Sequence, residues 1–259
     1  MFKLIFFLWR RQDFDRAAFI DYYENSHAIF GSNIVPRSDD YRRSYPRWDA
    51  CSGRGADEIF GFGPFDVMTE LWFRHRSGRE AQLLEAAKPE VRDAVVADES
   101  RFMDRSKQAY FVVDERGSAQ PGSSMERASA KIVHLCRQAP GISADEFIRR
   151  NEEERAPNLL HSIPGLVEYR RNYLVLNDPQ SFAGGVDVRL ELDPEMLGLS
   201  LMEEVWLDSE AAIQAAAKAF TKPDMLIDPA LSFAFPVDEY RADFGEVIAP
   251  FVILNEQCR

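Results

Sequence analysis

Hydrophobic and polar residues follow one pattern along the chain, and that pattern occurs twice. Residues 3–45 align without a gap on residues 131–173, with ten identities among 43 positions. Further along, the pattern Met-x-Glu-x-Trp at residues 68–72 recurs at residues 202–206. The identities include Lys3 with Lys131, Phe19 with Phe147, Glu24 with Glu152, Pro36 with Pro164, and Tyr41-Arg42-Arg43 with Tyr169-Arg170-Arg171. A repeat of this length indicates two copies of one small domain.

Both copies predict the same order of elements. A first strand leads to a helix, whose start is marked by Asp15 in the first copy and by Ser143 with Glu146 in the second. A strand with the Tyr-Arg-Arg run, a third strand, an alanine-rich helix that ends before a proline, and a last strand follow. The predicted ranges are 2–9, 67–73, 79–87 and 110–113 in the first copy, and 131–137, 201–207 and 210–220 in the second, with 232–237 or 247–254 as its last strand.

This order is that of the ferredoxin-like βαββαβ unit, whose helices cover one face of the sheet and leave the other face open. We therefore predict an α+β protein in which two tandem ferredoxin-like units pack sheet to sheet as an intramolecular, pseudo-dimeric α+β barrel. The N-terminal domain spans residues 1–116 and the C-terminal domain spans residues 129–259. Residues 117–128, rich in Gly and Ser, form the predicted linker.

Strand alternation separates a helix-covered face from a face inside the barrel. We assign Ile5, Phe7, Val133 and Leu135, which are apolar in both copies, to the helix-covered face of the first strands. The alternate residues are assigned to the interior, namely Leu4, Phe6, Leu8, Ile132, His134 and Cys136. In the third strands the residues predicted to point inward are Met68, Glu70, Trp72, Met202, Glu204 and Trp206.

Charge and cysteine content exclude several classes of protein. The 43 acidic against 31 basic residues give a formal charge of −12, which argues against nucleic-acid and anionic-membrane partners. Three cysteines without paired spacing predict neither a disulfide framework nor a metal knuckle, and favour a reducing, cytoplasmic location. The apolar residues 2–9 are too few for a membrane span and lack a cleavage site, so a buried strand is expected. The four histidines have no metal-ligand spacing, and no metal site is predicted.

The first copy resembles EthD-like proteins of the dimeric α+β barrel superfamily. The resemblance lies in Phe19-x2-Tyr22-Tyr23-x3-His27-Ala28, in Tyr41 and in the stretch 65–73. The second copy resembles them through Pro140-Gly141, Phe147, Arg155-Ala156-Pro157, Pro164-Gly165-Leu166, Tyr169 and Glu204-Val205-Trp206. The resemblance implies a barrel that holds small hydrophobic molecules, in most cases without a cofactor, and subunits that usually dimerise. The second copy carries Arg155 where the first has His27, so we expect one active cavity and one with a different role.

Two histidines are candidates for moving protons. His27 ends an amphipathic helix, and its ordinary pKa near 6.5 suits a general acid or base. His134 replaces the apolar residue Phe6 of the first copy and is predicted to pair with Glu204. The alternatives are structural: His27 bonded to helix carbonyls, and His134 as a satisfied core histidine.

The remaining candidates are assigned to substrate binding, with structural alternatives left open. Glu70 and Glu204 could instead accept hydrogen bonds from Arg43 or Arg171 as part of the fold, and for Glu70 this structural role is favoured because the residue is repeated in both copies. Tyr41, Tyr169, Arg43 and Arg171 alternate along one face of the second strands and are candidate oxyanion donors or packing residues. The predicted binding residues are Phe6, Trp9, Tyr23, Tyr41, Arg43, Glu70, Trp72, Arg155, Tyr169, Arg171 and Trp206.

These features predict a cofactor-independent lyase, dehydratase or isomerase that acts on a hydrophobic, aromatic or polyketide-like small molecule. His27, His134 and Glu204 are the predicted catalytic residues. The main alternative is a noncatalytic accessory protein that binds a hydrophobic pathway intermediate. Haem chemistry is disfavoured because no inward histidine is clearly placed as an axial ligand. Association of two chains as a homodimer is left open.

Overall fold

Eight antiparallel strands close into a barrel at the centre of the molecule. The computed structural model describes residues 2–56, 63–119, 125–175 and 198–242, and the fold is given for these ranges. The strands follow the order β2-β4-β1-β5-β7-β8-β6-β9, and β9 pairs with β2 to complete the ring. The short strand β3 also pairs with β9. Closure satisfies the backbone groups that an open sheet would leave at its edges.

The N-terminal half contains β1 to β5 and α1 to α4, and the C-terminal half contains the rest. The first half comprises β1 (Phe2–Arg10), α1 (Arg16–Tyr22), α2 (Ala28–Ile34), β2 (Asp40–Pro46), β3 (Ser52–Arg54), β4 (Val67–Phe73), α3 (Arg76–Ala86), α4 (Pro89–Glu99) and β5 (Met103–Ala119). The second half comprises β6 (Ala130–Gln138), α5 (Ala144–Arg150), α6 (Ala156–Ser162), β7 (Leu166–Val175), β8 (Leu201–Leu207), α8 (Ile213–Phe220) and β9 (Ile227–Ala242).

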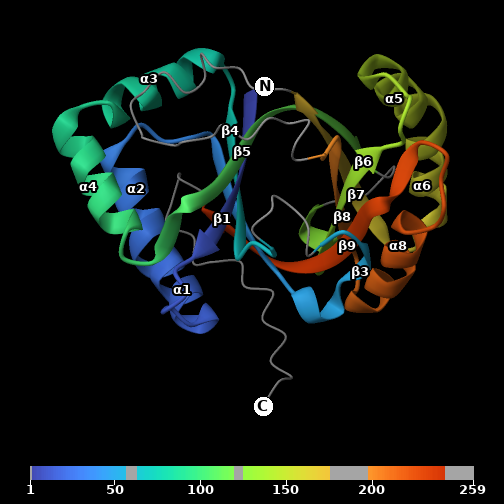
Figure 1. The fold of residues 1–259 in the computed structure, drawn as a ribbon, viewed down its shortest axis with the longest axis horizontal. Helices are drawn as coiled ribbons and strands as arrows, with labels where there is room; N and C mark the ends of the chain where they lie inside the picture. Colours follow the sequence, from blue (N-terminus) through green and yellow to red (C-terminus); the bar gives the residue numbers. More distant parts are fainter. Residues whose placement is uncertain (1, 57–62, 120–124, 176–197, 243–259) are drawn as a thin grey trace.

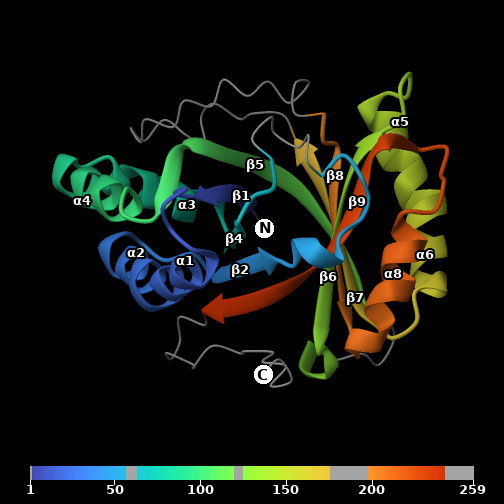
Figure 2. The same cartoon turned by 60° about the horizontal axis from the view of Figure 1, so that its bottom comes forward.

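Helices flank the strands on two opposite sides (Figure 1). Helices α1 to α4 lie outside the strands of the first half, and α5, α6 and α8 lie outside those of the second, as the turned view also shows (Figure 2). A π-helical turn, Tyr23–His27, joins α1 to α2, and the matching turn Asn151–Arg155 joins α5 to α6. Wide turns of this kind are rare and are often found at functional sites.

The predicted helix starts are confirmed. The Asp15 carboxylate accepts a hydrogen bond from the backbone N–H of Ala18 at 2.9 Å, and the Ser143 hydroxyl accepts one from Glu146 at 3.3 Å. Each bond satisfies a backbone donor that the first helical turn would otherwise leave unpaired.

The last strand of each half is long and continues onto the other half. Residues 112–119 of β5 pair with β7, and residues 237–242 of β9 pair with β2. The predicted linker at 117–128 therefore begins inside β5, because Gly117 pairs with Arg170. The predicted strand 232–237 lies within β9, whereas the alternative at 247–254 lies outside the described residues.

The face assignment for the first strands was wrong. Ile5 and Phe7 pair with Glu70 and Met68, and residues directly opposite in an antiparallel pair share a face. One buried cluster unites Ile5, Phe7, Val133 and Leu135 with residues of both halves, so this set lies inside the barrel. The interior is enclosed by strands of both halves, and these four residues pack in its apolar part, while the helix-covered face borders a cavity and a polar cluster. The assignment of the third strands is correct, since Met68 and Met202 belong to the same interior cluster.

Helix α4 has no counterpart between α8 and β9 in the described residues of the second half, and it was not predicted. Pro89 was expected only to end the preceding helix, but it is also the first residue of α4. Proline is favoured at that position because its missing N–H would have no helical partner. In the second half the chain passes from Pro223 into β9 within a few residues.

None of the helices in the described ranges is long and apolar enough to cross a membrane.

Candidate functional site

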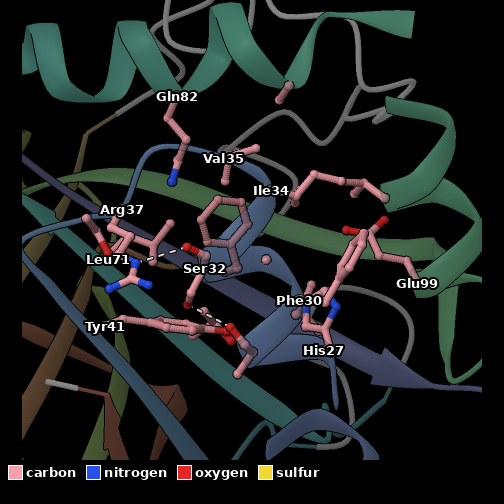
Figure 3. A pocket seen from close by; sticks show the side chains of 18 of the residues that line it. His27, Phe30, Ser32, Ile34, Val35, Arg37, Tyr41, Leu71, Gln82 and Glu99 are labelled. Carbon is pink, nitrogen blue, oxygen red and sulfur yellow. Dashed lines mark hydrogen bonds between the residues drawn. The ribbon is translucent and has the colours of Figure 1, made fainter. Parts of the chain in front are cut away.

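A cavity of about 280 Å³ lies between the sheet and the helices of the N-terminal half. Strands β1, β4 and β5 form one wall, and α2, α3 and α4 contribute to the other (Figure 3). Most of the lining is apolar, with Phe6, Leu8, Phe30, Leu71 and Leu83 among the contributors. An apolar cavity with a few polar groups is the usual form of a small-molecule site, and this one suits a small organic ligand.

His27 lines this cavity at the end of the π-helical turn. Its Nδ1 lies 2.7 Å from Oδ2 of Asp98, and the Tyr22 hydroxyl donates a 2.8 Å hydrogen bond to the other oxygen of that carboxylate. The imidazole also packs against the rings of Tyr23 and Phe102, with centroids 4.8 and 5.0 Å away. Contacts on several sides therefore fix the orientation of the His27 ring.

The Asp98 contact selects the tautomer of His27. Burial raises the pKa of Asp98, but the hydrogen bonds from His27 and Tyr22 outweigh it and hold that pKa below its ordinary value. An ionised carboxylate can only accept hydrogen bonds, so the proton resides on Nδ1 and neutral His27 keeps its lone pair on Nε2. No hydrogen bond joins Nε2 to any residue in the described ranges. This nitrogen is the one suited to take a proton from a ligand.

Glu99 adds a second titratable group to the same cavity. Figure 3 shows Glu99 and His27 on the same side of the pocket. Burial raises the pKa of Glu99, and the neighbouring His27 and Arg105 side chains oppose this only in part. Arg105 donates a 2.8 Å hydrogen bond to one of its oxygens. A raised pKa favours the protonated form of a carboxyl group, which is the form that can donate a proton.

Three hydroxyl groups form a chain along the sheet wall. The Tyr23 hydroxyl lies 2.8 Å from Oγ1 of Thr69, and Tyr41 donates to Tyr23 at 3.4 Å. Burial raises the pKa of Tyr23 to about 12, although hydrogen bonds from Thr69 and Tyr41 lower it in part. The tyrosines therefore stay protonated and act as hydrogen-bond donors rather than bases.

The α3 side of the cavity carries a buried cation. Arg79 lines the cavity with 9% of its surface exposed, and its Nη1 donates to the side-chain oxygen of Gln82. The Gln82 amide in turn donates a 3.0 Å hydrogen bond to the Pro36 carbonyl. Tyr110 lies on the same lining, and burial raises its pKa to about 12.

Of the predicted site residues, four lie together on this cavity: His27, Phe6, Tyr23 and Tyr41. Phe6 was expected inside the barrel and lies instead on the helix-covered face.

The predicted pair of His134 and Glu204 does not form. These side chains lie on opposite faces of the sheet, since His134 is directly opposite Glu203 on β8 and Glu204 is opposite Val133. His134 Nδ1 lies 2.7 Å from Glu203, and its Nε2 lies 2.9 Å from the Ser232 hydroxyl. Burial lowers the pKa of His134 despite Glu203, so this histidine is neutral at physiological pH.

Glu203 is the centre of a hydrogen-bonded cluster in the part of the second half that corresponds to the cavity of the first half. Arg155 donates from both terminal nitrogens to its carboxylate at 2.7 and 2.9 Å, and Tyr169 donates to it as well. Phe220 stacks on His134 with a centroid distance of 4.7 Å. Burial raises the pKa of Glu203, but Arg155 and His134 overcome this and lower it strongly. The predicted binding residues Arg155 and Tyr169 are thus engaged in a closed polar cluster.

Glu70, Glu204, Trp72 and Trp206 lie inside the barrel, as predicted, but their partners are lysines. Lys3 Nζ lies 2.7 Å from Glu70 and 2.9 Å from Glu204, and Lys131 Nζ lies 3.2 and 2.6 Å from the same residues. Trp72 and Trp206 donate to Glu115 and Glu239, which also bind the lysines. We call Lys3, Lys131, Glu70, Glu204, Glu115 and Glu239 the barrel ion network. Its lysines and the two central glutamates are at most 1% exposed, which suits a structural role.

The expected bonds from Arg43 and Arg171 to Glu70 and Glu204 are absent. Arg43 binds Glu24, and Arg171 binds Glu152 at 2.7 and 3.0 Å, on the helix-covered face. The neighbouring Arg42 is the residue directly opposite Glu70. Trp9 also lies away from the cavity, in the interior cluster, and donates to the Gly63 carbonyl at 3.1 Å.

Two groups of three metal-ligating side chains occur within the described ranges: His134, Cys136 and Glu203, and Glu70, Glu204 and Glu239. In both groups the carboxylates already bind cationic side chains, Arg155 in the first and the lysines in the second. These donor sets therefore do not favour a metal ion.

Asp98 and Glu99 were missed because they lie on α4, a helix outside the repeat. Arg79 was missed because the helix that contains it is repeated, but the second copy has Ile213 at the matching position. Pro89 followed by Glu90 and Val91 is a helix-start signal that could have placed Asp98 and Glu99 near the end of a helix. No sequence signal places that helix end beside His27.

Comparisons with known proteins agree with this fold. The family model of the EthD domain matches residues 11–106, a range that includes His27, Arg79 and Asp98. No curated protein matches the chain. The solved structure of an anthrone oxidase-like protein aligns with 10% sequence identity and a TM-score of 0.54, over 96% of this chain and 95% of its own, which shows a shared fold. A candidate monooxygenase from Lactobacillus acidophilus NCFM aligns with 12% identity and a TM-score of 0.47, over 92% of this chain and 93% of its own. The sequence-based recognition is confirmed for the N-terminal half, where residues 11–106 match the EthD domain.

Proposed function

We propose that the protein is an enzyme that moves a proton on a hydrophobic small molecule bound in the N-terminal cavity. The reaction class is that of a lyase, dehydratase or isomerase. The observation that carries this proposal is the Tyr22–Asp98–His27 chain, which presents an unprotonated Nε2 at an apolar cavity. A histidine held in one tautomer by a carboxylate is a recurrent arrangement in general base catalysis.

The roles of the residues follow from their chemistry. His27 removes a proton from an activated carbon of the ligand, and Asp98 stabilises the imidazolium that forms. The Tyr23 hydroxyl, which burial keeps protonated and which accepts a hydrogen bond from Tyr41, can donate a hydrogen bond to an oxygen that gains negative charge. His27 or Glu99, whose pKa is raised by burial, returns the proton at another atom, which completes an isomerisation or assists loss of a leaving group.

Duplication explains why one half holds the cavity. We propose that the chain consists of two tandem ferredoxin-like units, which is supported by the order second-third-first-fourth of the strands in each half. The matching π-helical turns support it as well. In the second unit Arg155, Glu203 and Phe220 occupy the region that is open in the first. The first unit thus provides the site, and the second completes the barrel.

Deuterium incorporation tests the proposal without knowledge of the substrate. A panel of hydrophobic ketones with acidic C–H bonds, led by 2-tetralone, is incubated with the protein in D₂O, and exchange is followed by NMR. We expect exchange above the buffer rate, a loss of at least 100-fold in His27→Gln, and a slower rate with a shifted pH profile in Asp98→Asn. His161→Gln, an exposed histidine of the second half, is the matched control.

Two results would reject the proposal. Exchange at the wild-type rate in His27→Gln would remove the catalytic role of His27. Ketones that bind but exchange no faster than in buffer would instead support a noncatalytic binding protein.

A further inference from the structure

Arg79 differs from the other buried arginines of the described residues. Arg42, Arg43, Arg155 and Arg171 are each ion-paired with a carboxylate, of Asp40, Glu24, Glu203 and Glu152 respectively. Arg79 is buried to a similar degree, yet its hydrogen bond goes to the neutral amide of Gln82. Its Nε has no hydrogen-bond partner, and within the described ranges no carboxylate pairs with it. The guanidinium is thus a buried positive charge without a counter-charge.

Such a charge is costly to keep in a folded protein. Transfer of a cation from water into an apolar site without a partner destabilises the fold, and buried charges are normally paired. Burial lowers the pKa of Arg79 to about 10, and Tyr110 offsets this only in part. The group therefore remains protonated at neutral pH. Because this unpaired charge destabilises the fold, we expect its counter-charge to come from a bound ligand.

The repeat shows that the fold does not need an arginine here. At the offset of 134 residues that relates the third strands and the following helices, Arg79 corresponds to Ile213 on α8. Ile213 is buried in the apolar core between the helices and the sheet of the second half. The position is therefore compatible with an apolar side chain, and the charge belongs to the half that holds the cavity.

The neighbours of Arg79 leave part of its guanidinium available. Gln82, one turn further along α3, takes the Nη1 donor and is itself held by the Pro36 carbonyl. The Nε and Nη2 hydrogens project in parallel from one edge of a guanidinium, and this edge matches the two oxygens of a carboxylate. Gln82 and His27 lie on opposite sides of the cavity (Figure 3). A ligand anchored at Arg79 would therefore extend across the apolar cavity toward His27.

We propose that the cavity accepts a hydrophobic carboxylate, whose anionic group pairs with Arg79 while its apolar body lies against Phe6, Leu71 and Leu83. The inference rests on the proposed function in that it takes this cavity as the substrate site, and it adds the class of substrate. Arg79 is then a binding and orienting residue that sets which end of the substrate faces His27.

Two probes of equal shape test the inference. 2-Naphthoate carries the carboxylate, and 2-naphthamide replaces it with a neutral amide. Titration calorimetry should give the naphthoate a Kd at least tenfold lower than the naphthamide in the wild-type protein. Arg79→Ile, which installs the residue of the second half, should remove this preference and leave naphthamide binding in place. Arg116→Gln removes an exposed arginine and should leave the preference unchanged.

The thermal midpoint of the ligand-free variant is a second measurement. Arg79→Ile should unfold at a higher temperature than the wild type, because an unpaired buried charge has been removed. Equal affinities of the two probes for the wild type, absence of naphthoate binding, a preference retained in Arg79→Ile, or a lower midpoint would each overturn the inference. The catalytic proposal is judged separately, since His27→Gln should abolish deuterium exchange and keep the preference for naphthoate.

Discussion

Gly31 offers a way to close the cavity without damage to the fold. It lies in α2 on the cavity wall, and a Cβ atom built on it would meet no other atom within 4 Å. The second half has Leu159 at the matching position, where it is buried among apolar side chains. Gly31→Leu therefore copies into the first half what the second half already contains.

The expected gain in stability has two parts. Replacing glycine with leucine inside a helix gains about 0.7 kcal/mol, because less backbone entropy is lost on folding. Burying the leucine side chain in the apolar cavity adds up to about 2 kcal/mol. The sum, about 1 to 3 kcal/mol, corresponds to a rise of roughly 2 to 8 °C in the thermal midpoint for a protein of this size.

Gly31→Leu should weaken ligand binding although it stabilises the fold. Because the leucine fills space that a ligand would use, the affinity for 2-naphthoate should fall at least tenfold and deuterium exchange should be lost. Leu159→Ala is the control, since it opens space in the second half, should cost about 2 to 5 kcal/mol of stability and should leave the affinity unchanged. Differential scanning calorimetry and titration calorimetry measure the two effects. A Gly31→Leu variant that binds naphthoate as tightly as the wild type would show that ligands do not occupy this cavity.

Two further predictions concern stability. Lys3→Met leaves carboxylates of the barrel ion network without one of their cations and should cost about 3 to 5 kcal/mol in urea unfolding. Lys88→Met, at an exposed ion pair, is the control and should have no measurable cost. A cost below about 1 kcal/mol for Lys3→Met would contradict the structural role of the network. Acidification should also destabilise the fold. The pKa of His134 lies below its ordinary 6.5 and that of Glu203 below 4.5, so the unfolded chain binds more protons and stability is lost as pH falls below 6.5 and then below 4.5. His134→Asn should flatten the fall between pH 6.5 and 5, and an unchanged slope would show that His134 is protonated in the folded protein.

The repeat allowed much of the fold to be predicted. Because both copies share one register, the order of most strands and helices, the two N-caps and the inward position of Glu70 and Glu204 followed from the sequence. The helix α4 and the length of β5 did not. The alignment also matched Lys3 with Lys131, yet their role required the packing across the barrel, which brings both lysines to both glutamates. Hydrophobic alternation gives two faces of a strand and does not say which one is enclosed. The first strands were therefore assigned to the wrong faces.

Only part of the candidate site was predicted, because several of its residues are brought together by contacts between distant parts of the sequence. His27, Tyr23, Tyr41 and Phe6 came from the family resemblance and from the comparison of the two copies. Asp98 contacts His27 across 71 positions of sequence, and Arg79 lines the same cavity from α3. No local sequence pattern specifies such an arrangement. His134 pairs with Glu203 rather than with Glu204 because adjacent residues of a strand lie on opposite faces of the sheet. A shift of one residue in the strand register would exchange the two glutamates.

The central claim is that ligands bind beside His27 in the first half and not beside His134 in the second. The chain has four histidines, so their side-chain ¹⁵N signals can be assigned with single His→Gln variants. During titration with 2-naphthoate we predict that the His27 signals shift and saturate, with Nδ1 protonated and Nε2 bare in the free protein, while those of His134 stay in place. A titration that shifts His134 and leaves His27 unchanged would contradict the account.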